Sequence, residues 1–391
     1  MVFYTTAPPF PGGRAIQPAF RAANSHKLAG MKVNGKAWRS IWPDATGRSV
    51  HIIDQTRLPF ELVTTELASL AEVVNAIRVM QVRGAPLIGV AAAFGIALAM
   101  RADASDASLD EAHRVLQATR PTAVNLAWAL AAMRSHLEPL APSLRAAAAW
   151  SQAQKMANED AGTNEAIGDQ GRPLLETLYR KLQRPINVLT HCNAGWMATV
   201  DWGTALAIIY KSHDAGIPLH VWVDETRPRN QGLLTAWELR GHGVPHTYIV
   251  DNAGGHLMQH GQVDLVLVGA DRVSRRGDVA NKIGTYLKAL AAFDNGIPFY
   301  AALPESTIDL ELGDAVQEIE IEQRAAGEVR AVTGRRTAGE SDLTIANLVD
   351  AGTNVANPGF DVTPSRLVTG IITERGVFAP AQLAASLAGR N

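Results

Sequence analysis

The first half of the chain alternates apolar and polar positions with the period of a helix. Between residues 65 and 160, the stretches ELASLAEVVNAIRVM, DEAHRVLQA and NLAWALAAMRSHLEPL repeat apolar residues at helical spacing. This spacing gathers apolar side chains on one helix face. We therefore expect a mostly helical N-terminal domain over residues 31–165. Residues 1–30 are rich in Pro, Gly and Ala without periodicity, so we expect an irregular arm there.

One stretch in this region is apolar at every position. It runs from Leu87 to Met100, between Pro86 and Arg101. A membrane-spanning helix needs about 20 such residues, so this run predicts a buried core helix. The N-terminus lacks the basic segment and the continuous apolar segment of a secretory signal. We therefore expect a soluble protein with no membrane contact.

Beyond about residue 185, short apolar runs alternate with helical stretches such as GTALAIIYKSHDAG and QGLLTAWELRGHG. Alternating strands and helices are typical of βαβ units and a parallel sheet. The predicted fold class is therefore α/β, with the mostly helical domain followed by a Rossmann-like, doubly wound parallel-sheet domain over residues 166–391. The more polar stretch 305–350 fits a covering insertion. The six predicted strands are NVLTH (187–191), PLHVWVDE (218–225), HTYIVDN (246–252), DLVLVGAD (264–271), PFYAALP (298–304) and LVTGIITE (367–374).

Composition narrows the partners and the compartment. The chain has 391 residues, with 36 Lys and Arg against 38 Asp and Glu, which gives a net charge of −2. Such a balance provides no global basic field, so we expect no binding to nucleic acid or to an anionic membrane. The single cysteine excludes an intrachain disulfide and a cysteine-based zinc finger, and it fits a cytoplasmic protein.

Several common cofactor motifs are missing. No G-x-G-x-x-G follows the first predicted strand, and neither G-x-x-x-x-G-K-[ST] nor G-x-S-x-G occurs. Dinucleotide, nucleoside triphosphate and serine hydrolase sites therefore lose their main support. His256 and His260 have the spacing of zinc ligands on one helix face, but no third ligand accompanies them. We expect a partly exposed helix face there, and no metal or cofactor.

Residues that can carry chemistry follow the predicted strands. Cys192 comes after the first strand and Asp271 after the fourth. Ligands of doubly wound sheets bind beyond the carboxyl ends of the strands, so both residues are candidates for one site. Taken alone, each has another explanation, because a free cysteine is often a buried core residue and an aspartate at a strand end often caps a turn or a helix.

Seven segments, in order along most of the chain, together resemble the methylthioribose-1-phosphate isomerase family. That family belongs to a wider group that includes regulatory subunits of translation initiation factor 2B. Ordered matches of this number are far more specific than any one short motif. The segments are RGAP (83–86) followed by IGVAAAFGIAL, RPTAVNLAWAL (120–130), LTHCNAG (189–195), DETRPRNQG (224–232), VGADRV with GDVANKIGTY (268–286), NPGFDVTP (357–364) and IITERGV (371–377).

The resemblance implies a dimeric enzyme of methionine salvage. Such an enzyme converts 5-methylthioribose 1-phosphate to 5-methylthioribulose 1-phosphate, an aldose-to-ketose isomerisation of a sugar phosphate, without a metal or nucleotide cofactor. The family's catalytic cysteine falls on Cys192, and its catalytic aspartate falls on Asp271. Its substrate-holding residues fall on Arg83, Gly84, Ala85, Arg120, Gln231, Asn281 and Lys282.

Some positions depart from the family pattern. Ala194, Trp196 and Trp202 replace smaller or different residues after the catalytic cysteine, and Gln323 and Gly359 are further departures. The changes beside the cysteine leave the substituent at C5 of the sugar open, so 5-deoxyribose 1-phosphate and ribose 1,5-bisphosphate are alternative substrates. A non-catalytic regulatory subunit of the same fold is another alternative, because fold alone does not determine function.

Three large side chains just after the catalytic turn bear on that substituent. Trp196, Met197 and Trp202 offer soft or flat apolar surfaces that suit a thioether and lack the charges that a second phosphate needs. We therefore expect them to line an apolar pocket for C5. The alternative is that they belong to the core beneath the following helix.

The implied reaction needs two groups that handle protons. The C1 oxygen carries the phosphate, so the ring cannot open to a free aldehyde. One group must assist the ring oxygen as it leaves, and hydrogen must pass from C2 to C1, through a phosphoenolate or as a hydride. Asp271 can supply the acid if burial raises its pKa. Cys192 can act as a thiolate base or as a thiol donor, and the sequence leaves both open.

The phosphate dianion needs fixed positive charge and backbone N–H groups. Arg83 can form a planar, bidentate contact, and Gly84 and Ala85 precede the predicted core helix, whose N-terminus suits an anion. A surface ion pair is the alternative for the arginine. Asn281 and Lys282 are expected to open the next helix and to contact the sugar or the phosphate from there.

Overall fold

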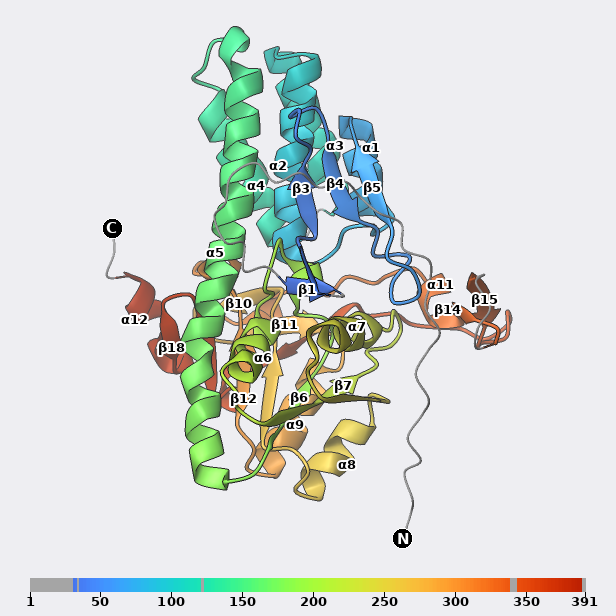
Figure 1. Cartoon of the computed structure of the whole chain (residues 1–391), viewed down its shortest axis with the longest axis vertical. Helices are drawn as coiled ribbons and strands as arrows, with labels where there is room; N and C mark the ends of the chain where they lie inside the picture. Colours follow the sequence, from blue (N-terminus) through green and yellow to red (C-terminus); the bar gives the residue numbers. More distant parts are fainter. Residues whose placement is uncertain (1–30, 34, 121–122, 338–342, 389–391) are drawn as a thin grey trace.

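The computed structural model describes residues 31–33, 35–120, 123–337 and 343–388, and Figure 1 shows a helical part above a sheet part. The arm expected over residues 1–30 lies outside the described residues. The helical part contains the antiparallel sheet β3-β4-β5 and the first four helices. The elements of this half of the chain are β1 (Met31–Val33), β2 (Lys36–Trp38), β3 (Ile41–Pro43), β4 (Val50–Ile53), β5 (Thr64–Leu67), α1 (Leu70–Arg78), α2 (Ala85–Ala102), α3 (Asp106–Gln117) and α4 (Val124–Leu137).

The uniformly apolar stretch forms the centre of the helical part. α2 packs against α1, α3, α4 and α5, and every residue from Leu87 to Met100 is buried, which confirms the predicted core helix. Among the described residues, α2 is the one helix with the length and composition of a membrane span, and 78% of it is buried inside the protein. Its apolar character is therefore explained by the helices that surround it.

The longest helix, α5 (Pro142–Leu182), runs along both parts of the molecule (Figure 1). It packs on α2 and α4 in the helical part and on α6 in the sheet part. Pro142 suits the first turn, where its missing N–H costs no helical hydrogen bond, and Gln183 ends the helix in the left-handed conformation. The domain boundary expected at residue 165 lies within this helix, so the two parts are joined by continuous helical backbone.

The sheet part is built on seven strands in the order β18-β17-β12-β9-β6-β7-β8. All six predicted strands are present and pair in parallel, and β18 adds an antiparallel edge. From β8 to β17 the chain order is 3-2-1-4-5-6, which is the doubly wound order of the Rossmann fold and confirms the predicted fold class. The strands are β6 (Ile186–Thr190), β7 (Leu219–Asp224), β8 (His246–Ile249), β9 (Leu265–Val268), β12 (Phe299–Ala302), β17 (Gly370–Thr373) and β18 (Gly376–Phe378).

Helices cover both faces of this sheet. Val188 of β6 belongs to a core with α5, α6 and α7, whereas the next residue, Leu189, belongs to a second core with α8 and α9. Successive residues of a strand point to opposite faces, so strands that are apolar throughout are buried on both sides. The covering helices are α6 (Ala205–Asp214), α7 (Gly232–His242), α8 (Ala253–Gln259) and α9 (Thr285–Asp294).

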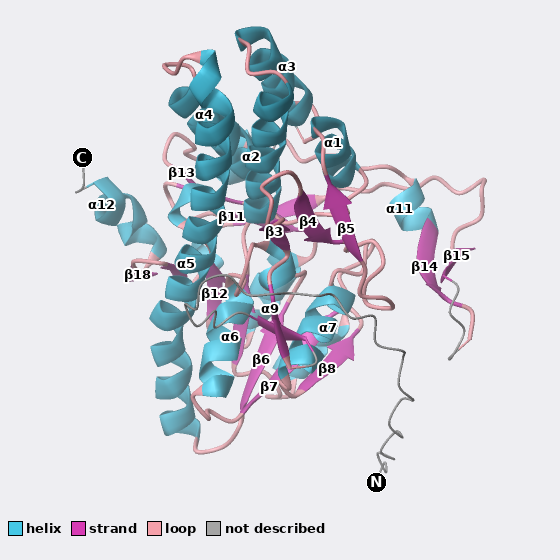
Figure 2. Ribbon diagram, turned by 45° about the horizontal axis from the view of Figure 1, so that its top comes forward, coloured by secondary structure: helices cyan, strands magenta, loops and turns pink. Residues whose placement is uncertain are grey.

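A second sheet, β13-β10-β11-β16, begins directly after β9. Asn281 and Lys282 are the last residues of β11, where antiparallel pairing with β16 keeps them extended. The expectation that they open a helix is therefore wrong, and α9 starts beyond them. The β14–β15 hairpin projects from the body (Figure 2). The remaining elements are β10 (Arg272–Ser274), β11 (Val279–Lys282), β13 (Ile308–Asp309), α10 (Ala315–Glu318), α11 (Gly327–Arg330), β14 (Ala331–Arg335), β15 (Leu343–Asn347), β16 (Phe360–Thr363) and α12 (Leu383–Ala388).

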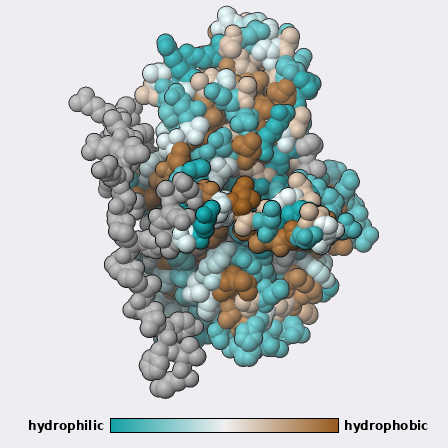
Figure 3. Space-filling view, turned by 90° about the vertical axis from the view of Figure 1, so that its right-hand side faces the viewer, coloured by the Kyte–Doolittle hydropathy of each residue, from teal (hydrophilic) through white to brown (hydrophobic). Residues whose placement is uncertain are grey.

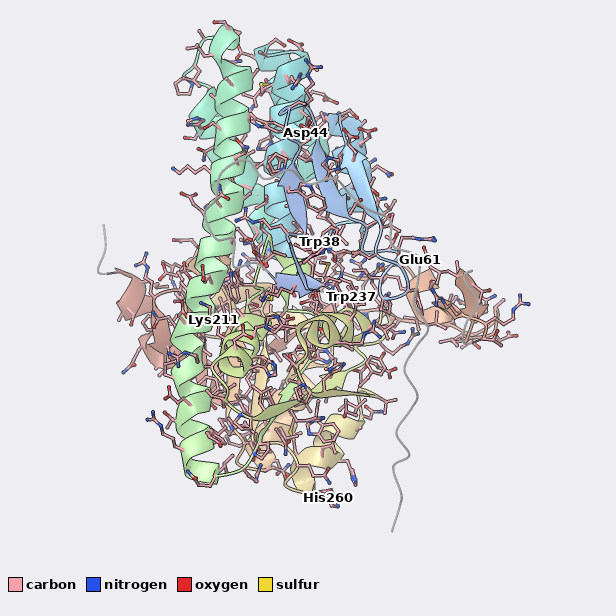
Figure 4. All side chains as sticks on the ribbon, viewed as in Figure 1. Trp38, Asp44, Glu61, Lys211, Trp237 and His260 are labelled. Carbon is pink, nitrogen blue, oxygen red and sulfur yellow. The ribbon has the colours of Figure 1, made fainter. Side chains whose placement is uncertain are left out.

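Side-chain contacts tie the two parts together. Trp38 of β2 packs on the core region that includes Trp237 of α7 (Figure 4). Within the sheet part, Lys211 of α6 approaches Asp169 of α5, with 2.8 Å between Nζ and Oδ1, and lies 4.7 Å from the ring centre of Trp202. On the face shown in Figure 3, hydrophilic and hydrophobic residues are interspersed over both parts.

Candidate active site

A cavity of about 820 Å³ lies beyond the carboxyl ends of β6 and β9. These strands are neighbours, and the chain order of the sheet reverses between them. A crevice forms at such a switch point because the connections on its two sides run in opposite directions. The helical part closes the crevice with the start of α2 and with α4. The cavity is lined by all nine residues that the resemblance implies: Arg83, Gly84, Ala85, Arg120, Cys192, Gln231, Asp271, Asn281 and Lys282.

Cys192 sits in a tight turn directly after β6. Its backbone adopts the left-handed conformation, with φ of 67°, which is uncommon for a residue other than glycine. Thr226 and Thr235 hold the turn, because Oγ1 of Thr226 accepts from the Cys192 N–H at 2.8 Å and Oγ1 of Thr235 donates to the Cys192 carbonyl at 2.8 Å. Burial raises the pKa of the thiol, although Arg83 and Lys282 act against this. The neutral thiol is therefore favoured in the unliganded site.

Asp271 follows β9 and faces the same cavity. Its N–H donates to the carbonyl of Ala280 on β11 at 2.9 Å, which fixes the backbone beside the second sheet. Burial raises the pKa of its carboxyl, while the cations of Lys282 and Arg120 limit the rise. A carboxyl with a raised pKa holds its proton at a higher pH than a free aspartate and can serve as a general acid.

Three cations surround the two reactive groups. Nη2 of Arg83 donates to Oδ1 of Asn193 at 2.7 Å, and Nζ of Lys282 donates to the carbonyl of Gly359 at 2.9 Å. Arg120 lies 4.0 Å from Glu322, a long ion pair with a weak hold on the guanidinium. Burial lowers the pKa of all three groups, so a bound dianion would restore charge balance there.

The start of α2 adds backbone donors to these cations. Gly84 is the N-cap, with φ of 95° and no side-chain cap, so the first-turn N–H groups are left for a ligand. A Cβ at Gly84 would collide with the backbone of Ala198, which together with the positive φ explains the glycine. The Arg83–Ala85 segment therefore offers a guanidinium beside a helix N-terminus.

Two buried amides complete the polar lining. Oε1 of Gln231, at the start of α7, is buried and has no hydrogen-bond partner among the described residues. Nδ2 of Asn281 donates to Oγ1 of Thr285 at 3.1 Å. A buried carbonyl oxygen without a partner costs free energy, so a hydroxyl group of a bound sugar would satisfy Gln231.

The expected C5 pocket of Trp196, Met197 and Trp202 is wrong. None of these three side chains lines the cavity; the turn after Cys192 carries them into the core that contains α6 and α7. The alternative, a place in the core, is correct. Apolar lining comes instead from Met80, Ile88, Val124, Ala127, Trp128, Ala131, Ile319 and Ile321.

Two buried residues of the site escaped the sequence analysis, Asn193 and Glu238. Oε1 of Glu238 accepts from Nδ2 of Asn193 at 2.8 Å, and Asn193 contacts Arg83. A signal for Glu238 exists in the sequence, because it lies on the helix face of Leu234, four residues earlier. An acidic residue on an apolar helix face requires a buried partner.

The histidines with metal-like spacing lie elsewhere. His256 of α8 and His260, directly after its last residue, are both exposed. Figure 4 shows His260 at the end of the sheet part that lies away from the helical part. His191, Asp224 and Asp251 do form a compact group of possible ligands. However, Nδ1 of His191 already contacts Asp224 at 3.1 Å, and Nζ of Lys288 lies 3.1 Å from the same carboxylate. This group supports the turn that carries Cys192.

Comparison with known proteins gives consistent matches. The initiation factor 2 subunit family matches residues 81–380. The methylthioribose-1-phosphate isomerase of Rhodospirillum rubrum is 59% identical over 366 residues, covering 92% of this chain and 93% of that protein. The enzyme of the same name from Methylorubrum populi is 61% identical over 350 residues, covering 89% of this chain and 95% of its own.

Solved structures also resemble this chain. The 5-methylthioribose 1-phosphate isomerase of Pyrococcus horikoshii has a TM-score of 0.77 and 39% identity, covering 90% of this chain and 95% of that one. The delta subunit of translation initiation factor eIF-2B from A. fulgidus has a TM-score of 0.74 and 39% identity, covering 88% of this chain and 97% of that one.

Proposed function

Since this chain belongs to the initiation factor 2 subunit family, we propose that it is an aldose–ketose isomerase that converts 5-methylthioribose 1-phosphate to 5-methylthioribulose 1-phosphate. One observation carries the proposal: a thiol and a carboxyl, both with raised pKa, share a cavity with three cations and a helix N-terminus. The high identity to enzymes of that name supports the same conclusion.

The phosphate group binds where the positive charge gathers. Arg83, Arg120 and the first turn of α2 provide donors for its oxygens. Lys282 faces the same cavity, where its charge lowers the pKa of both reactive groups. The sugar hydroxyls then face Gln231 and Asn281. This placement brings C1 and C2 of the sugar toward Cys192 and Asp271.

The protonation states favour one route for hydrogen. Neutral Asp271 donates its proton to the ring oxygen as the bond from C1 breaks, and the resulting carboxylate accepts the proton of the C2 hydroxyl. The hydrogen on C2 moves with its electron pair to C1, which leaves a ketone at C2 and returns Asp271 to its starting state. A neutral thiol is too weak a base to remove the C2 hydrogen as a proton, so Cys192 transfers no proton in this route and acts as a hydrogen-bond donor to an oxygen beside the reacting carbons.

The apolar wall on α4 supports a thioether at C5. Ala127, Trp128 and Ala131 line the cavity, and Trp128 is 51% exposed at its edge. Further arginines in the lining already have acidic partners, because Arg229 and Arg324 share Glu328 and Arg272 pairs with Asp309. A second phosphate would lack a free cation there, whereas a methylthio group fits an apolar wall.

A panel of aldose 1-phosphates that differ only at C5 tests the proposal. We expect the highest kcat/KM for the methylthio sugar, a lower value for 5-deoxyribose 1-phosphate and the lowest for ribose 1,5-bisphosphate. If the bisphosphate were the best substrate, the assignment of the apolar wall would be wrong.

A regulatory subunit without catalytic activity is the second candidate, and the likeness to the A. fulgidus delta subunit favours it. The presence of both Cys192 and Asp271 in the cavity favours an enzyme. Absence of turnover with every sugar of the panel, in a folded protein, would support the regulatory role.

We also propose a cytoplasmic homodimer without nucleic-acid or membrane partners. The net charge of −2 supports the lack of anionic partners. Leu287 and Phe293 are exposed apolar residues on α9, and contact with a second copy would remove such side chains from water. Light scattering after size-exclusion chromatography should give twice the chain mass, and a monomer mass would contradict the dimer.

A further inference from the structure

A buried carboxylate on α7 organises the turn that follows Cys192. Glu238 is 1% exposed. Its Oε1 accepts from Nδ2 of Asn193 at 2.8 Å and from the N–H of Met197 at 3.2 Å. Its Oε2 accepts from the N–H of Trp196 at 3.0 Å and from the hydroxyl of Tyr210 at 2.9 Å. Both oxygens are thus committed to donors, and charge-assisted hydrogen bonds of this kind are strong.

The turn is shaped to admit this carboxylate. A Cβ at Gly195 would collide with Oε2 of Glu238, so only glycine lets the backbone approach so closely. Burial raises the pKa of Glu238 to about 7, while its hydrogen bonds to Asn193 and Tyr210 and the charge of Arg83 lower it. Burial of a carboxylate carries a large desolvation free energy, which packing alone does not offset.

Asn193 connects Glu238 with Arg83, which lines the cavity. Its Nδ2 donates to Glu238 and, at 3.1 Å, to Oγ1 of Thr235. This leaves Oδ1 directed at Arg83, which donates to it from Nη2 at 2.7 Å. An amide can present either its oxygen or its nitrogen to a neighbour. Here the acceptor behind it determines that the oxygen faces the guanidinium.

We propose that Glu238 is a positioning residue, which acts through Asn193 to hold the guanidinium of Arg83 in the orientation that binds the phosphate of the substrate. The inference rests on the proposed function, since it assigns the phosphate to Arg83. Nε of Arg83 is buried without a hydrogen-bond partner among the described residues, so Asn193 is the contact that fixes the side chain. Without that contact the guanidinium can rotate away from its ligand.

The test measures binding of inorganic phosphate to the full chain by isothermal titration, with kcat and KM measured in parallel. Glu238→Gln keeps the volume of the side chain but turns an N–H toward one pair of donors. We expect its Kd for phosphate and its KM to rise roughly 10-fold, with kcat changed far less, because misorientation of a binding group weakens every complex. Tyr210→Phe is the matched control: it removes one donor to Glu238 without touching Asn193, so it should lower Tm but leave phosphate binding intact.

Two further variants separate positioning from a structural role. Asn193→Ala removes the contact to Arg83 while Glu238 stays unchanged. It should reproduce the weaker phosphate binding even if Glu238→Gln fails to fold. Glu238→Gln added to Arg83→Ala should weaken binding no further, since the residues act in series. Unchanged phosphate binding in Asn193→Ala, or multiplied effects in the double variant, would overturn the proposal. Phosphate binding does not require turnover, so loss of the proposed function alone would leave this test intact.

Discussion

The sheet part and the helical part contribute differently to one cavity. The sheet part supplies Cys192 and Asp271 from the ends of adjacent parallel strands, whereas the helical part supplies Arg83, the start of α2 and the apolar wall of α4. Strand ends place small reactive groups at fixed positions. Helix ends and helix faces hold charge and apolar surface. In the proposed reaction, the sheet part performs the chemistry and holds the sugar hydroxyls, whereas the helical part holds the phosphate and the substituent at C5.

Changes in the sheet part should have the largest effect. Asp271→Asn should lower kcat by roughly 100-fold or more, the usual scale for a general acid–base group. Cys192→Ala should lower kcat by about the same factor, because it removes a hydrogen-bond donor at the reacting carbons. Because the two groups serve one reaction, the double variant should lose little more than either single one. Both proteins should melt near the wild-type temperature, since neither change removes much packing.

Kinetics and thermal unfolding of the same two variants provide the measurement. A lowered Tm with near-normal kcat would instead assign both residues to the core.

Removal of the Arg83 side chain, in the helical part, should have the second-largest effect on activity. A charge-assisted hydrogen bond is worth about 1.5–3 kcal/mol, which corresponds to roughly 10–150-fold at about 1.4 kcal/mol per decade. Arg83→Ala should therefore raise KM and lower kcat/KM by that factor, with little loss of folding stability. Steady-state kinetics with the methylthio sugar measure it, and unchanged kinetics would show that Arg83 does not bind the phosphate.

The apolar wall should show the smallest effect, and only with one substrate. Trp128 is half-exposed, so its contact with a methylthio group is partial, and Trp128→Ala should lower kcat/KM for that sugar roughly 3- to 10-fold. The value for 5-deoxyribose 1-phosphate should hardly change. Leu144→Ala, an exposed residue of α5 outside the cavity lining, serves as the control. An equal loss with both sugars would remove Trp128 from substrate selection.

The sheet part was easier to predict from the sequence than the contacts made by the helical part. Parallel strands buried on both faces read as apolar runs, so β6, β7, β9, β12 and β17 were predictable. β8 is an edge strand without a buried residue, and it was predictable from its alternation with helical stretches. The two reactive residues were predictable as candidates, because topology places strand ends together. β11 is as short as several of these strands, but its sequence VANK ends in two polar residues and gives no apolar run, which is why Asn281 and Lys282 were expected on a helix.

The sequence could not predict which way the side chains after Cys192 point, or which buried polar residues pair with each other. Trp196 and Met197 follow Cys192 closely, but the backbone turns inward and buries them in the core. Glu238 meets Asn193 across more than forty positions, and a single sequence gives no information about which buried groups pair. The phosphate contacts from the helical part followed only from the resemblance, since an arginine before a helix is also common on surfaces.

The most direct test follows 5-methylthioribose 1-phosphate that carries deuterium at C2, incubated with protein dialysed against EDTA, by NMR. We predict that the wild-type protein forms a ketone at C2 with the deuterium retained at C1, and that Cys192→Ala and Asp271→Asn form far less of it in the same time. Absence of the ketone, from a folded wild-type protein that still binds inorganic phosphate, would contradict the proposed isomerase.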